Sequence, residues 1–388
     1  MSVTTGGVAR RAGPAPGAGR PPATTDPLPT SPAGGHPPPP QVGEARRDLR
    51  RVHAEDIAAV LGCLAASASV VWIIYTKLLP LTGKLGFALS WFAVFLGLYA
   101  VLVWSREDRL EATDRVLGAL WTATGCLAIG VLTSVVGFVA VRGSSAISHR
   151  NFFTQSLSAA GPLEPLSVGG ILHGIVGTLI MIAIAVVVTV PLGLATAVFL
   201  VEVGGPLARV VGMVVDAMTA LPSIVAGLFI YATWILILRF PNSGLAAALA
   251  LSVMMLPIIT RAAAVVLRLV PGSLREASYA LGSSQWRTVW SVVLPTARPG
   301  LATAVILGMA RGIGETSPVL LTAGYTLNFN ADPTAGPMVS LPLLTYELVR
   351  SGQPAYVERA YGAALTLLVL VFVLFLAARL IGRRRPGS

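Results

Sequence analysis

The chain has 388 residues, of which 54% are hydrophobic and only 12% are charged. Its mean hydropathy of +0.76 excludes a soluble globular protein of this length and indicates a membrane protein with several spans. The net charge of +11 does not indicate nucleic-acid binding, because the arginines lie at the ends of apolar segments and in the N-terminal tail.

Residues 1–54 are rich in proline, glycine and alanine, and carry seven arginines with almost no large apolar side chains. Such a segment cannot bury enough surface to fold, so we expect a disordered cytoplasmic tail. No long apolar run follows the arginines within the first 30 residues, which argues against a secretory signal peptide.

Apolar segments long enough to cross the hydrocarbon layer follow the tail, and their length and lack of strict alternation favour helices over barrel strands. The sequence therefore predicts an all-α polytopic membrane protein with eight transmembrane helices, at 56–76, 86–104, 117–140, 171–200, 209–238, 244–268, 300–323 and 361–381. The prolines at 222 and 257 each indicate a kink or a hinge within a span.

The distribution of arginine and lysine predicts the orientation. If both chain ends are cytoplasmic, 20 of the 28 arginines and lysines lie on the cytoplasmic side, in the tail, in 105–116, after the fourth span, from Arg261 to Arg298 and at the C-terminus. The positive-inside rule therefore places these parts in the cytoplasm of a cell whose plasma or inner membrane holds the protein, and the loops 141–170 and 324–360 outside.

The cytoplasmic loop 273–295 has the pattern of two helices joined by a sharp turn. Ser273 and Glu276 have the spacing of a capping box, and Gly282 suits the left-handed conformation that ends a helix. Trp286 and Trp290 then share one face of the second helix. The loop is either a docking element or an amphipathic helix lying on lipid headgroups.

This loop resembles the EAA loop of ABC importer permeases. The residues that carry the resemblance, at matching spacing, are Glu276, Ala277, Ser278, Gly282, Val292, Leu294 and Pro295. Ser278 stands where alanine is commoner and Val292 where isoleucine is, and both changes are conservative in volume. The resemblance implies that the first helix of the loop sits in a cleft on a cytoplasmic ATPase and passes its motion to the membrane helices.

No residues of this chain fit an ATP or metal site. Its only lysines, Lys77 and Lys84, lie outside any GxxxxGK[ST] pattern, so there is no phosphate-binding loop. The two cysteines, Cys63 and Cys126, are isolated in apolar runs and are expected to be packing residues. We therefore expect no catalytic residue, metal or cofactor on this chain, with ATP and magnesium bound by a partner ATPase.

The stretch ARGIGETSPVLL, residues 310–321, places opposite charges within a predicted span. Arg311 and Glu315 are four residues apart and lie on one helix face, where they can pair. Because a charge is costly in hydrocarbon, they should face the bundle interior or a watery path. Gly312 and Gly314 thin the helix, and Pro318 removes a backbone hydrogen bond, so the helix should bend there. The residue types fit an anion pathway or an ion pair that joins helices.

The stretches 310–324 and 221–231, together with SLPLLTYELVRSG before the last span, resemble PstA-type phosphate permeases. The resemblance implies that Arg311 is needed for phosphate movement, with Glu315 as its neighbour. Asp216 matches an acidic position of the family, and its role as a helix-end residue, a partner of an arginine or a pathway residue is open.

The resemblance also implies the domain organisation and the partners. The permease region would be 105–388, with the core of the family at about 171–381, and the two spans within 55–104 would be accessory helices additional to the usual six. The implied partners are a PstC-type permease, a PstB-type ATPase dimer and an extracytoplasmic phosphate-binding protein, with inorganic phosphate and membrane lipid but no nucleic acid.

Two alternative functions remain. The chain could be the PstC-type partner, since both permeases carry an Arg-x-x-Gly-Glu motif. A channel or secondary transporter could also use Arg311 and Glu315 without ATP, but such a protein has no need of an ATPase-binding loop. A membrane scaffold would leave the intramembrane charges unexplained.

Overall fold

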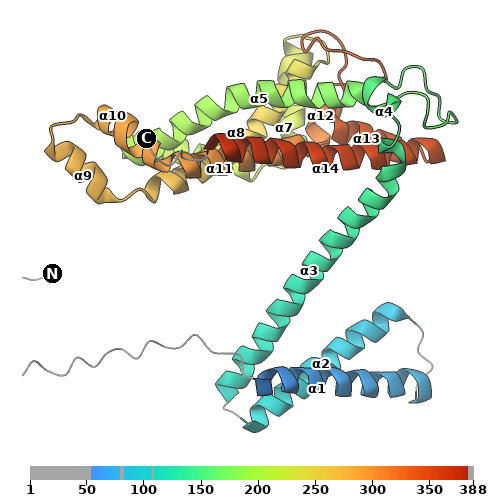
Figure 1. The fold of residues 1–388 in the computed structure, drawn as a ribbon. Helices are drawn as coiled ribbons and strands as arrows, with labels where there is room; N and C mark the ends of the chain where they lie inside the picture. The colour runs from blue at the N-terminus through green and yellow to red at the C-terminus, as the bar shows by residue number, and fades with distance from the viewer. Residues whose placement is uncertain (1–53, 79–82, 107–108, 383–388) are drawn as a thin grey trace, which may run out of the picture. The chain divides into compact units, whose positions relative to one another are not determined.

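The computed structural model describes residues 54–78, 83–106 and 109–382, and the predicted tail lies almost wholly outside this range. All regular structure in the described part is helical (Figure 1). Contacts divide the chain into two units with a boundary between Ala119 and Leu120, inside the long helix α3 (Arg109–Ile147). The two units are described separately.

The N-terminal unit is a helical hairpin followed by the start of α3. Helix α1 (Ala54–Ile73) continues as a π-helical turn, Ile74–Leu78, and α2 (Lys84–Arg106) packs against it. The indole of Trp91 donates a hydrogen bond to the carbonyl oxygen of Leu64 (3.1 Å), which joins the two helices. Cys63 is buried in this contact, as expected of a packing residue, whereas Cys126 in α3 is exposed.

Within its described residues, the C-terminal unit contains the rest of α3, eleven further helices and three π-helical turns. In chain order they are α4 (Asn151–Thr154), α5 (Leu172–Val198) with the turn Phe199–Val203, α6 (Gly205–Thr219), α7 (Ser223–Ile230) with the turn Tyr231–Ile237, α8 (Gly244–Arg268), α9 (Gly272–Ala280), α10 (Gln285–Thr288) with the turn Val289–Val293, α11 (Leu294–Ile313), α12 (Ser317–Thr322), α13 (Leu341–Arg350) and α14 (Pro354–Gly382).

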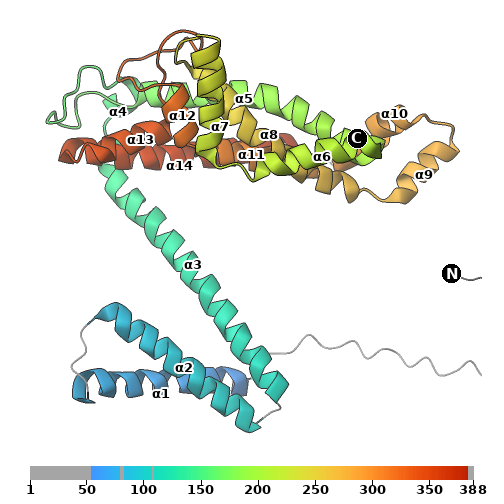
Figure 2. The ribbon, with the colours of Figure 1, turned by 180° about the vertical axis from the view of Figure 1, so that it is seen from behind.

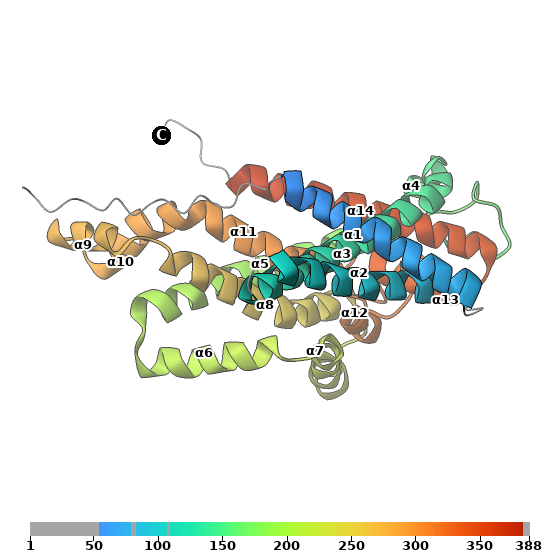
Figure 3. The ribbon, with the colours of Figure 1, turned by 90° about the horizontal axis from the view of Figure 1, so that it is seen from below.

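The number of spans agrees with the prediction. In the described part, seven helices are long and apolar enough to cross a membrane, and α6 with α7 adds an eighth if this bent pair is one span. Two predicted spans are nevertheless broken rather than continuous. The axes of α6 and α7 differ by 106° across Ala220–Pro222, and Figures 2 and 3 show α7 running across the direction of α6. The predicted span 300–323 is divided into α11 and α12.

Proline chemistry explains these breaks. Pro222 has an extended ψ of 143° at the start of α7, and Pro318 occupies the first turn of α12, where its missing N–H costs nothing. Pro257 differs, because it lies inside the continuous helix α8. A proline in a span thus marks a break at positions 222 and 318 but not at 257.

Helix α8 is at the centre of the unit, packed between α5 and α11. Small residues allow the close approach. A Cβ added to Gly193 of α5 would lie 3.0 Å from Ile259 Cγ2, and one added to Gly308 of α11 would overlap the same isoleucine. Ile259 is itself completely buried. The helix pairs are therefore held at a spacing that larger residues would not permit.

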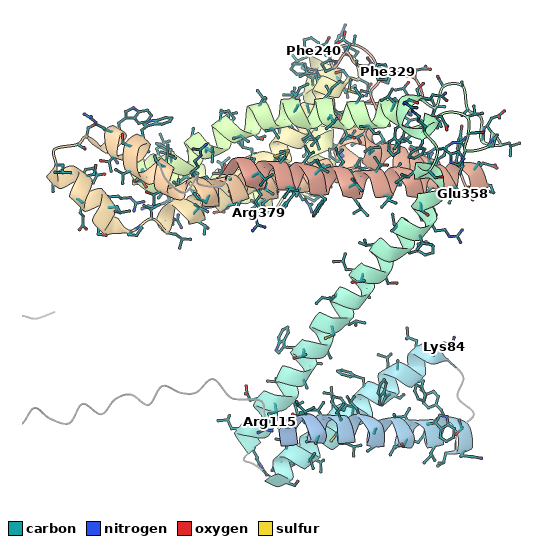
Figure 4. The ribbon with its side chains drawn as sticks, in the orientation of Figure 1. Lys84, Arg115, Phe240, Phe329, Glu358 and Arg379 are labelled. Carbon is teal, nitrogen blue, oxygen red and sulfur yellow. The ribbon has the colours of Figure 1, made fainter. Side chains whose placement is uncertain are left out.

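The two ends of the C-terminal unit differ in structure. Helices α9 and α10 form one end, and α4 and α13 lie at the other (Figure 1). In Figure 4, Glu358 of α14 lies at the α4 end, whereas Arg379, near the other end of α14, lies short of α9 and α10. The loop 269–299 and the loops around α4 and α13 are therefore separated by the length of the bundle, as the predicted topology requires.

A buried arginine organises the loop between α4 and α5. Arg359 of α14 is completely buried, and the adjacent Tyr356 donates its hydroxyl to the carbonyl oxygen of Ala160 (3.1 Å). The Nη2 group of Arg359 donates to three carbonyl oxygens of the loop, those of Glu164 (3.1 Å), Pro165 (2.7 Å) and Val168 (2.9 Å). A charged group is tolerated there because carbonyl oxygens solvate it.

The loop between α12 and α13 is shaped by its own polar side chains. Asn330 Nδ2 donates to the carbonyl oxygens of Ala335 (2.9 Å) and Pro337 (3.0 Å). The hydroxyl and the backbone N–H of Thr334 both donate to the carboxylate of Asp332, and these hydrogen bonds lower the pKa of Asp332. This loop therefore has a defined conformation without regular secondary structure.

A substitution at Gly177 of α5 can test how closely the C-terminal unit is packed. A Cβ at this position would overlap the carbonyl oxygen of Val339, and the next residue, Thr178, accepts a hydrogen bond from the backbone N–H of Leu341 (2.8 Å). We expect Gly177→Ala to destabilise the protein by about 1–3 kcal/mol through overpacking. Thermal unfolding in detergent measures the effect. Gly130→Ala is the matched control, because nothing lies within 4 Å of its added Cβ, and an equal loss in both variants would contradict the close contact.

Candidate functional site

The last turn of α11 places Arg311 at the wall of a cavity of about 290 Å³. The other lining residues are Met218, Thr219, Leu221, Ala226, Val253, Met254 and Ile258, from the end of α6, the break after it, α7 and α8. Arg311 is the one charged residue among them. The volume far exceeds the roughly 10–15 Å³ that a single water needs. The cavity can therefore hold water and a small anion beside the guanidinium.

Arg311 and Glu315 form the predicted ion pair, with 3.0 Å between Nε and Oε1. The arginine side chain is 58% exposed and the carboxylate only 12%, so the guanidinium is not sealed among side chains. In the described part of the chain, its Nη groups make no hydrogen bond. The glutamate thus holds one edge of the guanidinium and leaves the remaining N–H groups available for an anion.

The helix break explains how the pair is accommodated. Helix α11 ends at Ile313, and the backbone N–H of Glu315 donates to the carbonyl oxygen of Gly312 (3.2 Å). Helix α12 begins only after Thr316, with Pro318 in its first turn. Glu315 therefore lies on irregular backbone, which membrane proteins tolerate where protein or water covers it.

The two sequence motifs that suggested this site lie against each other. A Cβ added to Gly227 of α7 would lie only 2.7 Å from the Cα of Pro318 in α12. The segments 221–231 and 310–324 are thus in direct backbone contact, although about 90 residues of sequence separate them. Leu221 and Ala226 of the first segment and Arg311 of the second line the cavity.

The structure pairs Asp216 with an arginine of another helix. Its carboxylate forms an ion pair with Arg261 of α8, whose Nη2 also donates to the carbonyl oxygen of Gly212 (2.9 Å). Asp216 does not line the cavity, but Met218 and Thr219, which follow it on α6, do. Of the three roles open for Asp216, the pairing with an arginine is observed, and a role in the pathway stays a prediction.

The loop 273–295 has the predicted helix, turn and helix. Gly282 has a φ of +79°, and its N–H donates to the carbonyl oxygen of Tyr279 (2.8 Å). The N–H of Ser283 reaches the carbonyl oxygen of Ser278 (3.2 Å). These two bonds make the Schellman motif that ends α9. The predicted cap is wrong, since α9 begins at Gly272 after Pro271 and Ser273 lies inside its first turn.

Some of the remaining residues of the loop are exposed, and the others lie where the loop joins α11. Glu276 and Ala277 are exposed on α9, and Trp286 and Trp290 pack edge to face, 5.4 Å between ring centroids. Val292 and Leu294 are half-buried, and Pro295 occupies the first turn of α11. The exposed residues at the end of the bundle are therefore placed where a partner can contact them.

The departure at Ser278 has a structural consequence. Its hydroxyl is buried and lies 2.8 Å from the hydroxyl of Thr288 on α10. An alanine could not make this bond. In this chain a hydrogen bond therefore joins the two helices of the loop.

Sequence patterns did not reveal Glu202, which lies just after α5. Its carboxylate pairs with Arg275 of α9, with 2.7 Å between Oε1 and Nη2. The available signal was that Glu202 is the only acidic residue between Glu164 and Asp216. An isolated acid at the end of an apolar span is a candidate for a specific ion pair.

Comparison with known proteins identifies the family. Residues 189–385 match the family described as "Binding-protein-dependent transport system inner membrane component". The chain belongs to this family. The matched residues include the cavity, the loop 273–295 and α14. The chain is thus a multi-pass membrane permease subunit of an importer, and the family implies an ATPase and a binding protein as partners.

Several members of the family have high sequence similarity to this chain. It is 46% identical over 244 residues to the phosphate transport system permease protein PstA 1 of Mycobacterium tuberculosis, covering 63% of this chain and 80% of the relative. It is 44% identical over 273 residues to PstA of Mycobacterium leprae, covering 70% and 89%. It is 34% identical over 241 residues to PstA of Pasteurella multocida, covering 62% and 83%.

One solved structure with similarity to the chain is the inward-facing MetNI methionine ABC transporter. The TM-score is 0.44 at 23% sequence identity, over 55% of this chain and 93% of the matched chain.

The left-handed conformation of Gly282 predicts a specific defect. Nothing lies within 4 Å of an added Cβ, so a substitution causes backbone strain rather than a clash. We expect Gly282→Val to cost about 1–2 kcal/mol in the turn and to weaken binding of the ATPase subunit. Copurification of the ATPase from detergent measures this. Gly272→Ala, which also has nothing within 4 Å and no positive φ, should bind normally. Normal ATPase binding by the valine variant would contradict a role for this turn in docking.

Asp216→Asn separates pairing from a pathway role. The carboxylate is 64% exposed, so its loss should change the stability by no more than about 1 kcal/mol. Because Asp216 does not line the cavity, we expect the transport rate per assembled complex to stay close to that of the wild type. Transport in proteoliposomes, normalised to assembled complex, is the measurement. A strong loss at normal assembly would place Asp216 in the pathway.

Proposed function

We propose that the chain is the PstA-type permease subunit of an ATP-driven importer of inorganic phosphate. The names of the similar proteins support the substrate, since the three relatives described above are phosphate transport permeases. The observation that carries the proposal is the exposed guanidinium of Arg311 at a cavity within the membrane-spanning unit. A guanidinium presents several N–H donors in a plane, which suits the oxygens of phosphate.

The pairing of Arg311 with Glu315 explains how a guanidinium can stay in the membrane when the site is empty and still bind phosphate when it arrives. In the empty site the carboxylate neutralises the guanidinium, which lowers the cost of holding a charge within the membrane. When phosphate arrives, the Nη groups bind its oxygens while Glu315 keeps its bond to Nε. Because Glu315 partly neutralises the Arg311 guanidinium, the anion is attracted to it but is not held too tightly to leave.

Transport requires partners with defined positions. We place the α9 end of the bundle in the cytoplasm, where a PstB-type ATPase dimer binds and hydrolyses ATP with magnesium, and both chain ends on the same side. The phosphate-binding protein docks at the opposite end, around α4 and α13, and a PstC-type permease completes the pathway. This chain holds no cofactor of its own in this scheme.

Two other functions are less well supported. The similar proteins described above are PstA rather than PstC permeases, which disfavours the partner role. An ATP-independent channel would not need the exposed loop 273–295 with its ordered turn at Gly282. Phosphate flux through the chain alone in liposomes would support the channel, and a requirement for the ATPase supports the importer.

The substitution Arg311→Gln tests the proposed function. Losing a charged hydrogen-bond donor at the site should weaken interaction with phosphate by about 1.5–3 kcal/mol, which corresponds to a loss of uptake of about tenfold or more. Arg311→Lys keeps the charge without the planar donors, so its uptake should be intermediate. Uptake is measured with radiolabelled phosphate in cells that have no other copy, together with the amount of assembled complex.

Arg379→Gln is the matched control for this experiment. Arg379 lies in the last turn of α14 and is exposed, but it does not line the cavity. Its uptake should equal that of the wild type. If Arg311→Gln also transports phosphate normally, the pair of Arg311 and Glu315 is a structural ion pair and the proposed pathway is wrong.

A further inference from the structure

The side chain of Arg275 joins three elements at the α9 end of the bundle. Its guanidinium binds both carboxylate oxygens of Glu202, at 2.7 Å from Nη2 and 3.3 Å from Nε. Its Nη1 and Nη2 groups also donate to the carbonyl oxygens of Val270 (2.7 Å) and Leu267 (3.0 Å). Arg275 therefore connects α9 to the turn that ends α5 and to the last carbonyls of α8.

This ion pair is protected from solvent, unlike the exposed pairs of the chain. The side chain of Glu202 is 5% exposed and that of Arg275 is 19% exposed. The backbone of Glu202 is also engaged, because Gln285 of α10 donates to its carbonyl oxygen. A buried bidentate pair with additional carbonyl partners has a fixed geometry, so displacement of one member displaces the other.

A second contact connects α9 to α11, the helix that carries Arg311 at the cavity. The buried hydrogen bond between Ser278 and Thr288 ties α9 to α10, which continues through a π-helical turn into α11. Helix α11 carries Arg311, whereas α8 carries the cavity residues Val253, Met254 and Ile258. The short helix α9 is therefore joined to both walls of the cavity, to the Arg311 wall by Ser278 and to the α8 wall by Arg275.

We propose that the pair of Glu202 and Arg275 transmits the displacement of α9 to the end of α5, and through the packing of α5 on α8 to the α8 wall of the cavity, when the ATPase moves α9. This inference rests on the proposed function, since it assumes an ATPase bound at α9. Both residues are positioning residues, because neither lines the cavity beside Arg311. Without the pair, α9 keeps its connection to α8 but can move while the end of α5 stays in place.

Two substitutions test this role in the complete transporter complex. Glu202→Gln keeps the shape of the side chain but removes its charge, and Arg275→Lys keeps the charge but loses the planar donors. We expect both complexes to assemble and to hydrolyse ATP. The number of ATP molecules hydrolysed per phosphate transported in proteoliposomes should rise by about fivefold or more.

Arg268→Lys is the matched control. Arg268 lies in the last turn of α8, is exposed and makes no ion pair within the described residues. Its ATP-to-phosphate ratio should equal that of the wild type. An unchanged ratio in Glu202→Gln and Arg275→Lys would overturn the proposal. Loss of the assembled complex in both variants would also overturn it, because the pair would then only hold the fold together.

Hydrogen exchange separates this inference from the proposed substrate. In the wild-type complex, binding of a non-hydrolysable ATP analogue should change amide exchange both in α9 and in the turn Phe199–Val203 that ends α5. In Glu202→Gln the change should persist in α9 and disappear from this turn. This measurement needs no phosphate, so it stays decisive if the wild type proves to transport another anion. A change in the turn that persists in the variant would overturn the proposal, because another contact would then transmit the movement.

Discussion

The cost of placing a charge within a membrane determines the architecture around Arg311. A guanidinium is tolerated there only if polar groups or water surround it. The break between α11 and α12 supplies an acidic partner from irregular backbone, and the bend between α6 and α7 opens the space in which water can enter. The helix breaks, the glycines beside them and the cavity therefore all lower the free-energy cost of keeping the Arg311 guanidinium in the membrane.

The close packing of α8 has a different origin. Lipid tails are as apolar as leucine, so helices in a membrane gain little from hiding apolar side chains and depend on fitted van der Waals contacts. The glycines of α5 and α11 that face Ile259 meet this need. Since α8 contributes cavity residues as well, the helix that holds the core together also forms a wall of the candidate pathway.

The local features could be predicted from the sequence, whereas the long-range ones could not. The length of the apolar segments predicted the spans, and the four-residue spacing predicted the pair of Arg311 and Glu315, which the structure confirms at 3.0 Å. The turn at Gly282 follows from the φ that only glycine adopts easily. The capping pattern at Ser273 misled, because Pro271 and Gly272 start the helix earlier.

The bend of 106° exceeds what a proline alone implies. Beyond the bend, α7 packs closely on α12 through Gly227 and Pro318, which lie far apart in sequence. The pair of Glu202 and Arg275 depends equally on tertiary structure, because 73 residues separate its members and each looks like an ordinary charge at a segment end. Sequence patterns report on neighbours along the chain, and these contacts join residues that only folding brings together.

The arginine of α14 that binds the loop before α5 has a consequence for association. Its carbonyl partners fix the path of that loop within the single chain, before any other protein arrives. Ordering a flexible loop is one of the entropic costs of forming a complex, and here that ordering has already taken place during folding. A protein that docks at this end therefore meets a loop that is already ordered, so binding there needs little change in the backbone of this chain.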